Sequence, residues 1–271
     1  CGEDSILPLY KGGVIPMDFL DVPLRTKGER SYGLTSIADF GTPIGQLEDY
    51  LQDYHSYIDI AKIGIGSAYV TPNLQEKIDL YKKYNVIPYC GGTLFEKCYV
   101  QEKIDEYAKS LHALGIEWIE ISNGTIDIPL HKRITLIKKL KQHFNVIAEV
   151  GSKDQDKEMP LSEWEHEINL LLAAGCKYVI TEGRDSGTAG IYNRSGSVNM
   201  ELINQISKNI DVNKVIFEAP TPKQQMFFIN QFGTNVNLGN VKIQDVLVLE
   251  SQRLGLRSET FFLGEKSWNL P

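Results

Sequence analysis

Short apolar segments alternate with longer segments of mixed polar and apolar character along almost the whole chain. Such short apolar runs, bounded by glycine or polar residues, are typical of parallel strands buried on both faces. We expect strands at 33–40, 57–65, 86–92, 118–124, 146–151, 178–183, 215–220 and 235–240.

The segments between these strands carry apolar residues at helical spacing. In the segment 73–84, Leu74, Ile78 and Tyr81 fall on one face and leave lysines on the other. Prolines near the starts and glycines after the ends fit helix boundaries. The pattern predicts helices over 73–84, 101–114, 129–144, 161–174, 200–209, 222–232 and 243–254.

Eight alternating strand–helix units favour an α/β fold, a single (β/α)8 TIM barrel. A doubly wound open sheet of eight strands is the alternative architecture. We place the barrel domain at residues 31–262, after an N-terminal arm at 1–30 and before a C-terminal tail at 263–271.

The charge balance and the cysteines narrow the class of protein. The chain has 28 Lys+Arg against 35 Asp+Glu, a formal net charge of −7, which argues against a duplex nucleic-acid partner. It has no apolar run long enough to span a membrane, so we expect no membrane partner. Its four cysteines show neither a CxxC pair nor zinc spacing, which favours a reduced, cytoplasmic protein.

Ionisable or amide side chains stand near the ends of seven of the predicted strands. Barrel enzymes collect their chemistry at the carboxyl ends of the strands, and buried charges are costly unless paired or metal-bound. A structural ring of salt bridges explains any one of these residues, but the converging set favours function. The set comprises Asp39, Lys62, Glu120, Glu149, Glu182 and Glu218, with Asn235 and Asn237 on the last strand.

Five clustered acids cannot all stay ionised without cations, so we expect a hard divalent ion, most simply Mg2+. Lys62, Lys153 and Arg184 lie nearby, which indicates an anionic phosphate or carboxylate substrate. The glycine-rich loop 183–190 could cradle such an anion. No histidine ends a strand, so proton transfer falls to lysine or glutamate.

Several of these strand-end segments resemble the phosphosulfolactate synthase family, in order and at matching positions, and the Bacillus-type members most. They are GTLFE (92–96), EISNGT (120–125), EVGSK (149–153), EGRDSG (182–187), FEAP (217–220), NVNLGN (235–240) and LGLRSET (254–260). The resemblance implies a (β/α)8 barrel and a carbon–sulfur lyase. Its reaction is the Mg2+-dependent addition of sulfite to C3 of phosphoenolpyruvate, giving (2R)-phospho-3-sulfolactate for sulfonate biosynthesis.

Within that reaction we assign hypothetical roles to individual residues. Lys153 is our expected proton donor and Lys62 the alternative. Glu120, Glu149 and Glu182 are the expected metal ligands. The expected substrate-binding residues are Arg184, Ser186, Gly187, Arg257, Asn237 and Asp39.

The chain departs from the family at the end of the second strand. The family commonly reads Lys-x-Gly-Trp-Gly-Thr-Ser there, whereas residues 62–68 read KIGIGSA. This leaves open a paralogous lyase or isomerase acting on another enolisable phospho-acid or nucleophile. A non-catalytic relative of the plant heat-stress-associated proteins is a further alternative, against which the retained strand-end charges argue. We also expect a homo-oligomer.

Overall fold

The computed structural model describes residues 19–154, 159–184 and 186–263. Most of the expected arm (1–30) and tail (263–271) therefore lies outside the described residues, as does Asp185 of the glycine-rich loop.

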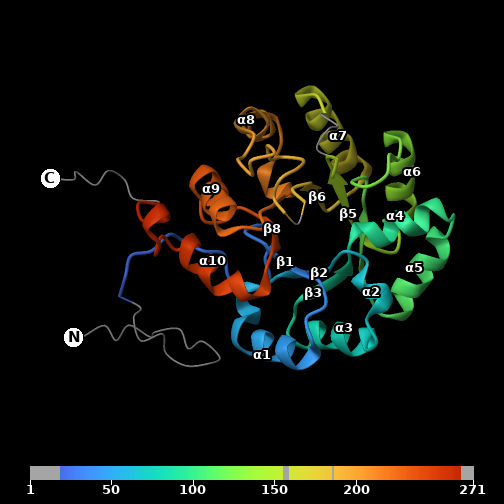
Figure 1. Cartoon of the computed structure of the whole chain (residues 1–271), viewed down its shortest axis with the longest axis horizontal. Helices are drawn as coiled ribbons and strands as arrows, with labels where there is room; N and C mark the ends of the chain where they lie inside the picture. The colour runs from blue at the N-terminus through green and yellow to red at the C-terminus, as the bar shows by residue number, and fades with distance from the viewer. Residues whose placement is uncertain (1–18, 155–158, 185, 264–271) are drawn as a thin grey trace, which may run out of the picture.

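A parallel sheet forms the centre of the described chain (Figure 1). Its hydrogen-bonded order is β3-β2-β1-β8-β7-β6-β5-β4. The two end strands, β3 and β4, lie against each other without a ladder between them in the described residues, so the sheet closes into a barrel with one unpaired seam. The strands are β1 (Thr35–Asp39), β2 (Ile60–Ile63), β3 (Ile87–Cys90), β4 (Trp118–Ile121), β5 (Asn145–Val150), β6 (Tyr178–Thr181), β7 (Val215–Glu218) and β8 (Leu238–Val241).

Helices surround this barrel (Figure 1). Their apolar side chains are buried against the strands. Proline precedes three of them, and α9 begins with a capping box between Thr221 and Gln224. The helices are α1 (Ile44–Tyr54), α2 (Ser67–Val70), α3 (Leu74–Lys83), α4 (Gly92–Val100), α5 (Ile104–Ala113), α6 (Leu130–Leu140), α7 (Leu161–Ala174), α8 (Met200–Asn209), α9 (Pro222–Phe232) and α10 (Val246–Arg253). The predicted (β/α)8 barrel is confirmed.

Two local predictions are wrong. The segment after β3 is a helix, α4, which is missing from the helices that we expected. The last strand begins three residues later than expected, at Leu238. The Asn237 side chain accepts a hydrogen bond from the Leu34 amide and donates to the Asn213 and Val215 carbonyls, so it ties together the amino ends of three strands.

Charged side chains also close the amino-terminal end of the barrel. The buried Arg253 guanidinium donates to the carbonyls of Thr234, Val236 and Leu34. Arg25 pairs with Glu250 at 3.1 Å beside it. We call this end of the barrel the floor, and the opposite end, where the strands finish, the mouth. None of the described helices has the length and apolarity needed to cross a bilayer.

Candidate active site

Five charged side chains lie at the mouth: Lys62 from β2, Glu120 from β4, Glu149 from β5, Glu182 directly after β6 and Glu218 from β7. Paired residues on neighbouring strands face the same side of a sheet. Glu120 pairs with Ile147, and Glu149 pairs with Ile180. Ile147 and Glu149 are two residues apart on β5, so Glu120 and Glu149 face the same side of the sheet, the inside of the barrel. The four glutamates are at most 2% exposed.

Lys62 connects two of these carboxylates. Its Nζ lies 2.7 Å from Glu218 Oε1 and 4.0 Å from Glu120 Oε2. Burial alone would lower the pKa of Lys62, but the carboxylates of Glu120 and Glu218 outweigh it and raise the pKa well above its usual value. Lys62 is therefore a fixed positive charge inside the barrel.

Lys153 sits between the other two carboxylates. Its Nζ lies 3.5 Å from Glu149 Oε1 and 3.4 Å from Glu182 Oε2. Burial would lower the pKa of Lys153, but Glu149 and Glu182 raise it, so the amine carries a proton at neutral pH. Its side chain is 30% exposed, which makes Lys153 the more accessible of the two lysines.

The backbone of Gly124 approaches this lysine–carboxylate group closely. A Cβ at this position would lie 2.6 Å from Glu149 Oε1, 2.7 Å from Lys153 Nζ and 2.9 Å from Glu182 Oε2. Such contacts are too short for any side chain, so glycine here leaves the ion pairs their space.

The mouth glutamates differ in protonation. Burial raises the pKa of Glu120 to about 8 and raises that of Glu182 well above its usual value, with neighbouring carboxylates adding to both shifts. Burial opposes ionisation of Glu149 too, but Lys153, Lys62 and hydrogen bonds from Glu182 and Ser122 lower its pKa to about 2. At neutral pH protons therefore partly neutralise the excess of acids.

The same acids could accept a hard cation in place of these protons. Both carboxylate oxygens of Glu120 and Oε2 of Glu182 are buried without a hydrogen-bond partner, which is the kind of oxygen donor that Mg2+ prefers. Within the described chain, however, no three Asp, Glu, His or Cys side chains are assembled around one point as a ready-made metal site. The donors fit in kind, and a cation would compete with protons for them.

The site contains two further buried residues, Glu96 and Ser122, which we did not select from the sequence. Ser122 Oγ lies 2.9 Å from Glu96 Oε1 and 2.8 Å from Glu149 Oε1. The signals were present, because Ser122 shares the face of Glu120 on its strand and Glu96 ends the motif GTLFE. Residue 96 lies outside the helices that we expected, and the helix α4 brings Glu96 to the mouth.

The Asp39 side chain does not point into the mouth, so the expectation of five converging strand-end acids is wrong for this one. Ala38 pairs with Lys62 and shares its inward direction, which turns Asp39 outward. Its carboxylate accepts from Lys77 Nζ at 2.7 Å and from the Tyr81 hydroxyl at 3.0 Å, both on α3. This pairing, with two backbone amides, lowers the pKa of Asp39 against the effect of burial.

Two other expected substrate-binding residues also lie away from the mouth. Asn237 holds strand ends together at the floor. The helix α10 ends at the floor with Arg253, and Arg257 follows it. Arg257 Nε lies 3.8 Å from Glu259 Oε2. The structure does not bring either residue to the lysine–carboxylate group.

The glycine-rich loop does lie beside that group. The backbone amide of Arg184 donates to Glu182 Oε1, and a Cβ on Gly190 would lie 1.9 Å from the Glu182 carbonyl oxygen. Ser186 Oγ is 2.8 Å from Thr188 Oγ1, and the Gly187 carbonyl accepts from Gln224 Nε2 at 3.0 Å. Arg184, Ser186 and Gly187 are thus next to the mouth, on a loop anchored to Glu182.

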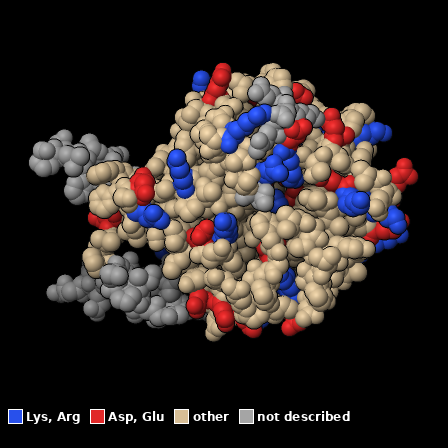
Figure 2. Space-filling model, viewed as in Figure 1, with Lys and Arg blue, Asp and Glu red and all other residues tan. Residues whose placement is uncertain are grey.

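The structure has two notable hollows. One of about 810 Å3 lies between the loops after β5 and β6, with Ser152, Trp164, Gly190 and Tyr192 among its lining residues; Lys153 does not line it. Basic and acidic side chains are interspersed over the face seen in Figure 2, without a single-sign patch.

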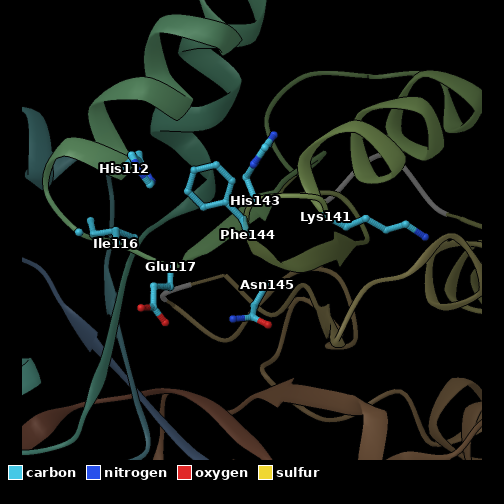
Figure 3. A pocket seen from close by; sticks show the side chains of 8 residues that line it. His112, Ile116, Glu117, Lys141, His143, Phe144 and Asn145 are labelled. Atoms are coloured by element: carbon cyan, nitrogen blue, oxygen red, sulfur yellow. The ribbon is translucent and has the colours of Figure 1, made fainter.

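The other hollow, of about 460 Å3, lies near the amino ends of β4 and β5 (Figure 3). His143 and Lys141 point away from Glu117 and Asn145 there, so its polar groups do not converge on one ligand.

A (β/α)8 barrel with buried lysines and carboxylates at the carboxyl ends of its strands has the organisation of a barrel enzyme. A family model described as (2R)-phospho-3-sulfolactate synthase (ComA) matches residues 23–259. The chain belongs to this family.

Curated relatives agree with this assignment. Phosphosulfolactate synthase of Bacillus subtilis is 40% identical over 247 residues, covering 90% of this chain and 98% of the relative. Phosphosulfolactate synthase of Methanocaldococcus jannaschii is 43% identical over 235 residues, covering 84% and 94%. Protein HEAT-STRESS-ASSOCIATED 32 of Arabidopsis thaliana is a more distant relative, 22% identical over 275 residues, covering 88% and 94%.

Solved structures are similar in fold alone. The 3-keto-L-gulonate-6-phosphate decarboxylase of Vibrio cholerae aligns with a TM-score of 0.52 and 11% identity, covering 82% of this chain and 97% of that chain.

Proposed function

We propose that the chain is a phosphosulfolactate synthase that adds sulfite to C3 of phosphoenolpyruvate and forms (2R)-phospho-3-sulfolactate, with Mg2+ as cofactor. The main support is membership of the family over residues 23–259. The mouth agrees with it, because a protonated lysine between two carboxylates suits addition to an unsaturated acid.

The reaction requires one new C–S bond and one new C–H bond. The sulfur lone pair attacks C3, and the electrons of the C2–C3 double bond move toward C2 and the carboxylate as an enediolate. Lys153 then gives a proton to C2 from one face, which sets the configuration, and regains a proton from solvent. Lys62 is the alternative donor, but its contact with Glu218 and its smaller exposure favour an electrostatic role.

The loop residues would bind the substrate anions. Arg184, Ser186 and Gly187 lie on the glycine-rich loop attached to Glu182, where a guanidinium and backbone amides can hold a phosphate or sulfite group. We leave Asp39, Asn237 and Arg257 out of this role because the chain places them elsewhere.

Glu120, Glu149 and Glu182 would hold Mg2+, because their buried oxygens are hard donors and two of these side chains carry unpartnered oxygens. When bound, the ion would stabilise the negative charge that develops on the substrate carboxylate. Because the ion would replace protons on these carboxyl groups, its binding should release protons. Calorimetry of Mg2+ binding in two buffers of different ionisation enthalpy measures that release, and equal heats in both buffers would contradict it.

The decisive experiment is turnover. Purified protein is mixed with phosphoenolpyruvate, sulfite and Mg2+, with and without chelator, and phosphosulfolactate is followed by mass spectrometry. We expect product that chelator abolishes. Binding of phosphoenolpyruvate without product would instead indicate a different nucleophile or phospho-acid, and neither binding nor product would favour a non-catalytic relative. A cytoplasmic location and homo-oligomeric assembly stay predictions.

A further inference from the structure

Glu96 occupies a special place in the barrel. It lies on α4, the helix after β3, and its Oε1 accepts hydrogen bonds from Ser122 Oγ at 2.9 Å and from the Thr125 amide at 2.9 Å. Ser122 and Thr125 both follow β4. Glu96 therefore bridges the mouth end of the seam at which β3 and β4 have no ladder between them in the described chain.

The cost of this arrangement is high for a purely structural clasp. Glu96 is 2% exposed, and its Oε2 has no hydrogen-bond partner. An unpaired buried carboxylate oxygen destabilises the fold, so an apolar side chain without an acceptor for Ser122 would fill this place at a lower cost. This points to a role of Glu96 beyond closing the barrel.

The contact with Ser122 suggests what that role is. Ser122 Oγ also lies 2.8 Å from Glu149 Oε1, the same oxygen that is 3.5 Å from Lys153 Nζ. A hydroxyl has one proton to donate. Ser122 therefore cannot donate to both carboxylates at once, and what Glu96 supplies is a contact that fixes the Ser122 oxygen beside Glu149.

We propose that Glu96 is a positioning residue for the reaction, acting through Ser122 on the Glu149 carboxylate that contacts Lys153. This inference rests on the proposed function for its kinetic part only. The chain of contacts from α4 to Lys153 is a property of the folded protein and can be measured without turnover.

The kinetic test compares Glu96→Ala, Glu96→Gln, Ser122→Ala and the double variant Glu96→Ala/Ser122→Ala. We expect Glu96→Ala and Ser122→Ala each to lower kcat about 10- to 100-fold, with KM for phosphoenolpyruvate changed less than about threefold. Glu96→Gln keeps an oxygen acceptor for Ser122 and Thr125 and should stay within about threefold of the parent. The double variant should be no worse than the single variants, because both remove one linkage.

The second readout is the reactivity of Lys153 toward a brief pulse of acetic anhydride, measured by peptide mass spectrometry. A loosened Glu149 should leave the Lys153 amine more accessible, so Glu96→Ala and Ser122→Ala should each raise its acetylation several-fold, and the double variant no further. Glu167→Ala is the matched control, because Glu167 is also a buried helical carboxylate but pairs with Arg133, away from the mouth. It should change neither kcat nor Lys153 acetylation.

The outcomes separate the two proposals. Parent protein without product would overturn the proposed function, while the acetylation series would still decide the linkage. Unchanged acetylation in Glu96→Ala and Ser122→Ala, additive losses in the double variant, or a Glu96→Gln variant as impaired as Glu96→Ala would each overturn the positioning role. If Glu96→Ala does not fold, Ser122→Ala alone carries the test, and its normal kcat and acetylation would refute the proposal.

Discussion

The two ends of the barrel use buried charge differently. At the floor, Arg253 donates to three backbone carbonyls, and Arg25 pairs with Glu250. At the mouth, Glu120 has no hydrogen-bond partner on either oxygen, and Glu182 lacks one on Oε2. Floor charges thus hold strand ends through backbone carbonyls, although Arg253 Nε and Arg25 Nη2 stay without a hydrogen-bond partner. Mouth charges contact one another, as Lys62 does with Glu218 and Lys153 with Glu182, and their spare acceptors are carboxylate oxygens.

This difference distinguishes stabilising charge from functional charge within one fold. Burying a carboxylate oxygen without a hydrogen-bond partner costs free energy, and protonation of Glu120 and Glu182 offsets only part of it. Groups left in such a state can respond to a ligand, a proton or a cation. Substitutions at the mouth should therefore change activity more than stability, and substitutions at the floor should do the reverse.

The largest expected effect is at Lys153. Lys153→Ala removes the proposed proton donor and should lower kcat at least about a thousandfold. Product formation by mass spectrometry measures it. Lys83→Ala, which removes an exposed lysine paired with Glu48, is the control. Normal turnover of Lys153→Ala would refute the donor assignment.

The floor should show the opposite behaviour. Arg253→Ala leaves three buried carbonyls without their donor and should lower the free energy of unfolding by about 3–4 kcal/mol. Its kcat per folded molecule should stay within about twofold of the parent. Denaturant titration and active-site-normalised kinetics test both parts. If Arg253→Ala lowered kcat without lowering stability, the claim that floor residues serve stability and mouth residues serve activity would be wrong.

Glu120 should make stability depend on pH. Its pKa of about 8 in the folded chain exceeds the ordinary value of 4.5, so the folded state holds the proton more tightly than the unfolded state. The resulting contribution of Glu120 to the free energy of unfolding is complete below pH 4.5 and is lost as the pH rises through 8. Without Mg2+, the parent should therefore lose about 2 kcal/mol relative to Glu120→Gln between pH 6 and pH 8.

Unfolding titrations at several pH values measure this difference. Glu48→Gln, at an exposed carboxylate of α1, should follow the parent over the same range. Parallel pH curves for the parent and Glu120→Gln would show that Glu120 is ionised throughout.

The sequence predicted the architecture well because strand and helix periodicity report directly on burial. It also predicted four mouth glutamates and both lysines, since side-chain alternation along a strand is regular. It failed at Asp39, because a shift of one residue along a strand turns a side chain from the inside of the barrel to the outside. The sequence also placed Asn237 within the last strand, whereas Asn237 lies just before it and binds backbone groups of neighbouring strands. An asparagine in that structural role cannot be told from a substrate-binding one by sequence alone.

Glu96 was missed for a different reason. No periodicity within a segment reports that a helix after β3 touches a serine after β4, because that contact depends on closure of the barrel. Long-range contacts of this kind follow from the topology and cannot be read from local pattern.

The mouth carries backbone strain as well as carboxylate oxygens without a hydrogen-bond partner. Ile65, three residues after Lys62, has a φ of 50°, in the left-handed region that β-branched residues avoid. Its side chain is 61% exposed, so packing contributes little to offset the strain. Ile65→Asn should raise the free energy of unfolding by about 1 kcal/mol, because asparagine tolerates this conformation.

Val70→Asn is the matched control for Ile65→Asn, which has the smallest expected effect. Val70 is 74% exposed on the neighbouring helix α2 and is not among the residues with positive φ, so its replacement removes an apolar side chain without relieving strain. Denaturant titration of both variants should show a gain for Ile65→Asn alone. If the strained turn also shapes the substrate pocket, the stabilised variant should have a raised KM for phosphoenolpyruvate. Gain of stability with unchanged kinetics would confine the functional part of the mouth to its charged residues.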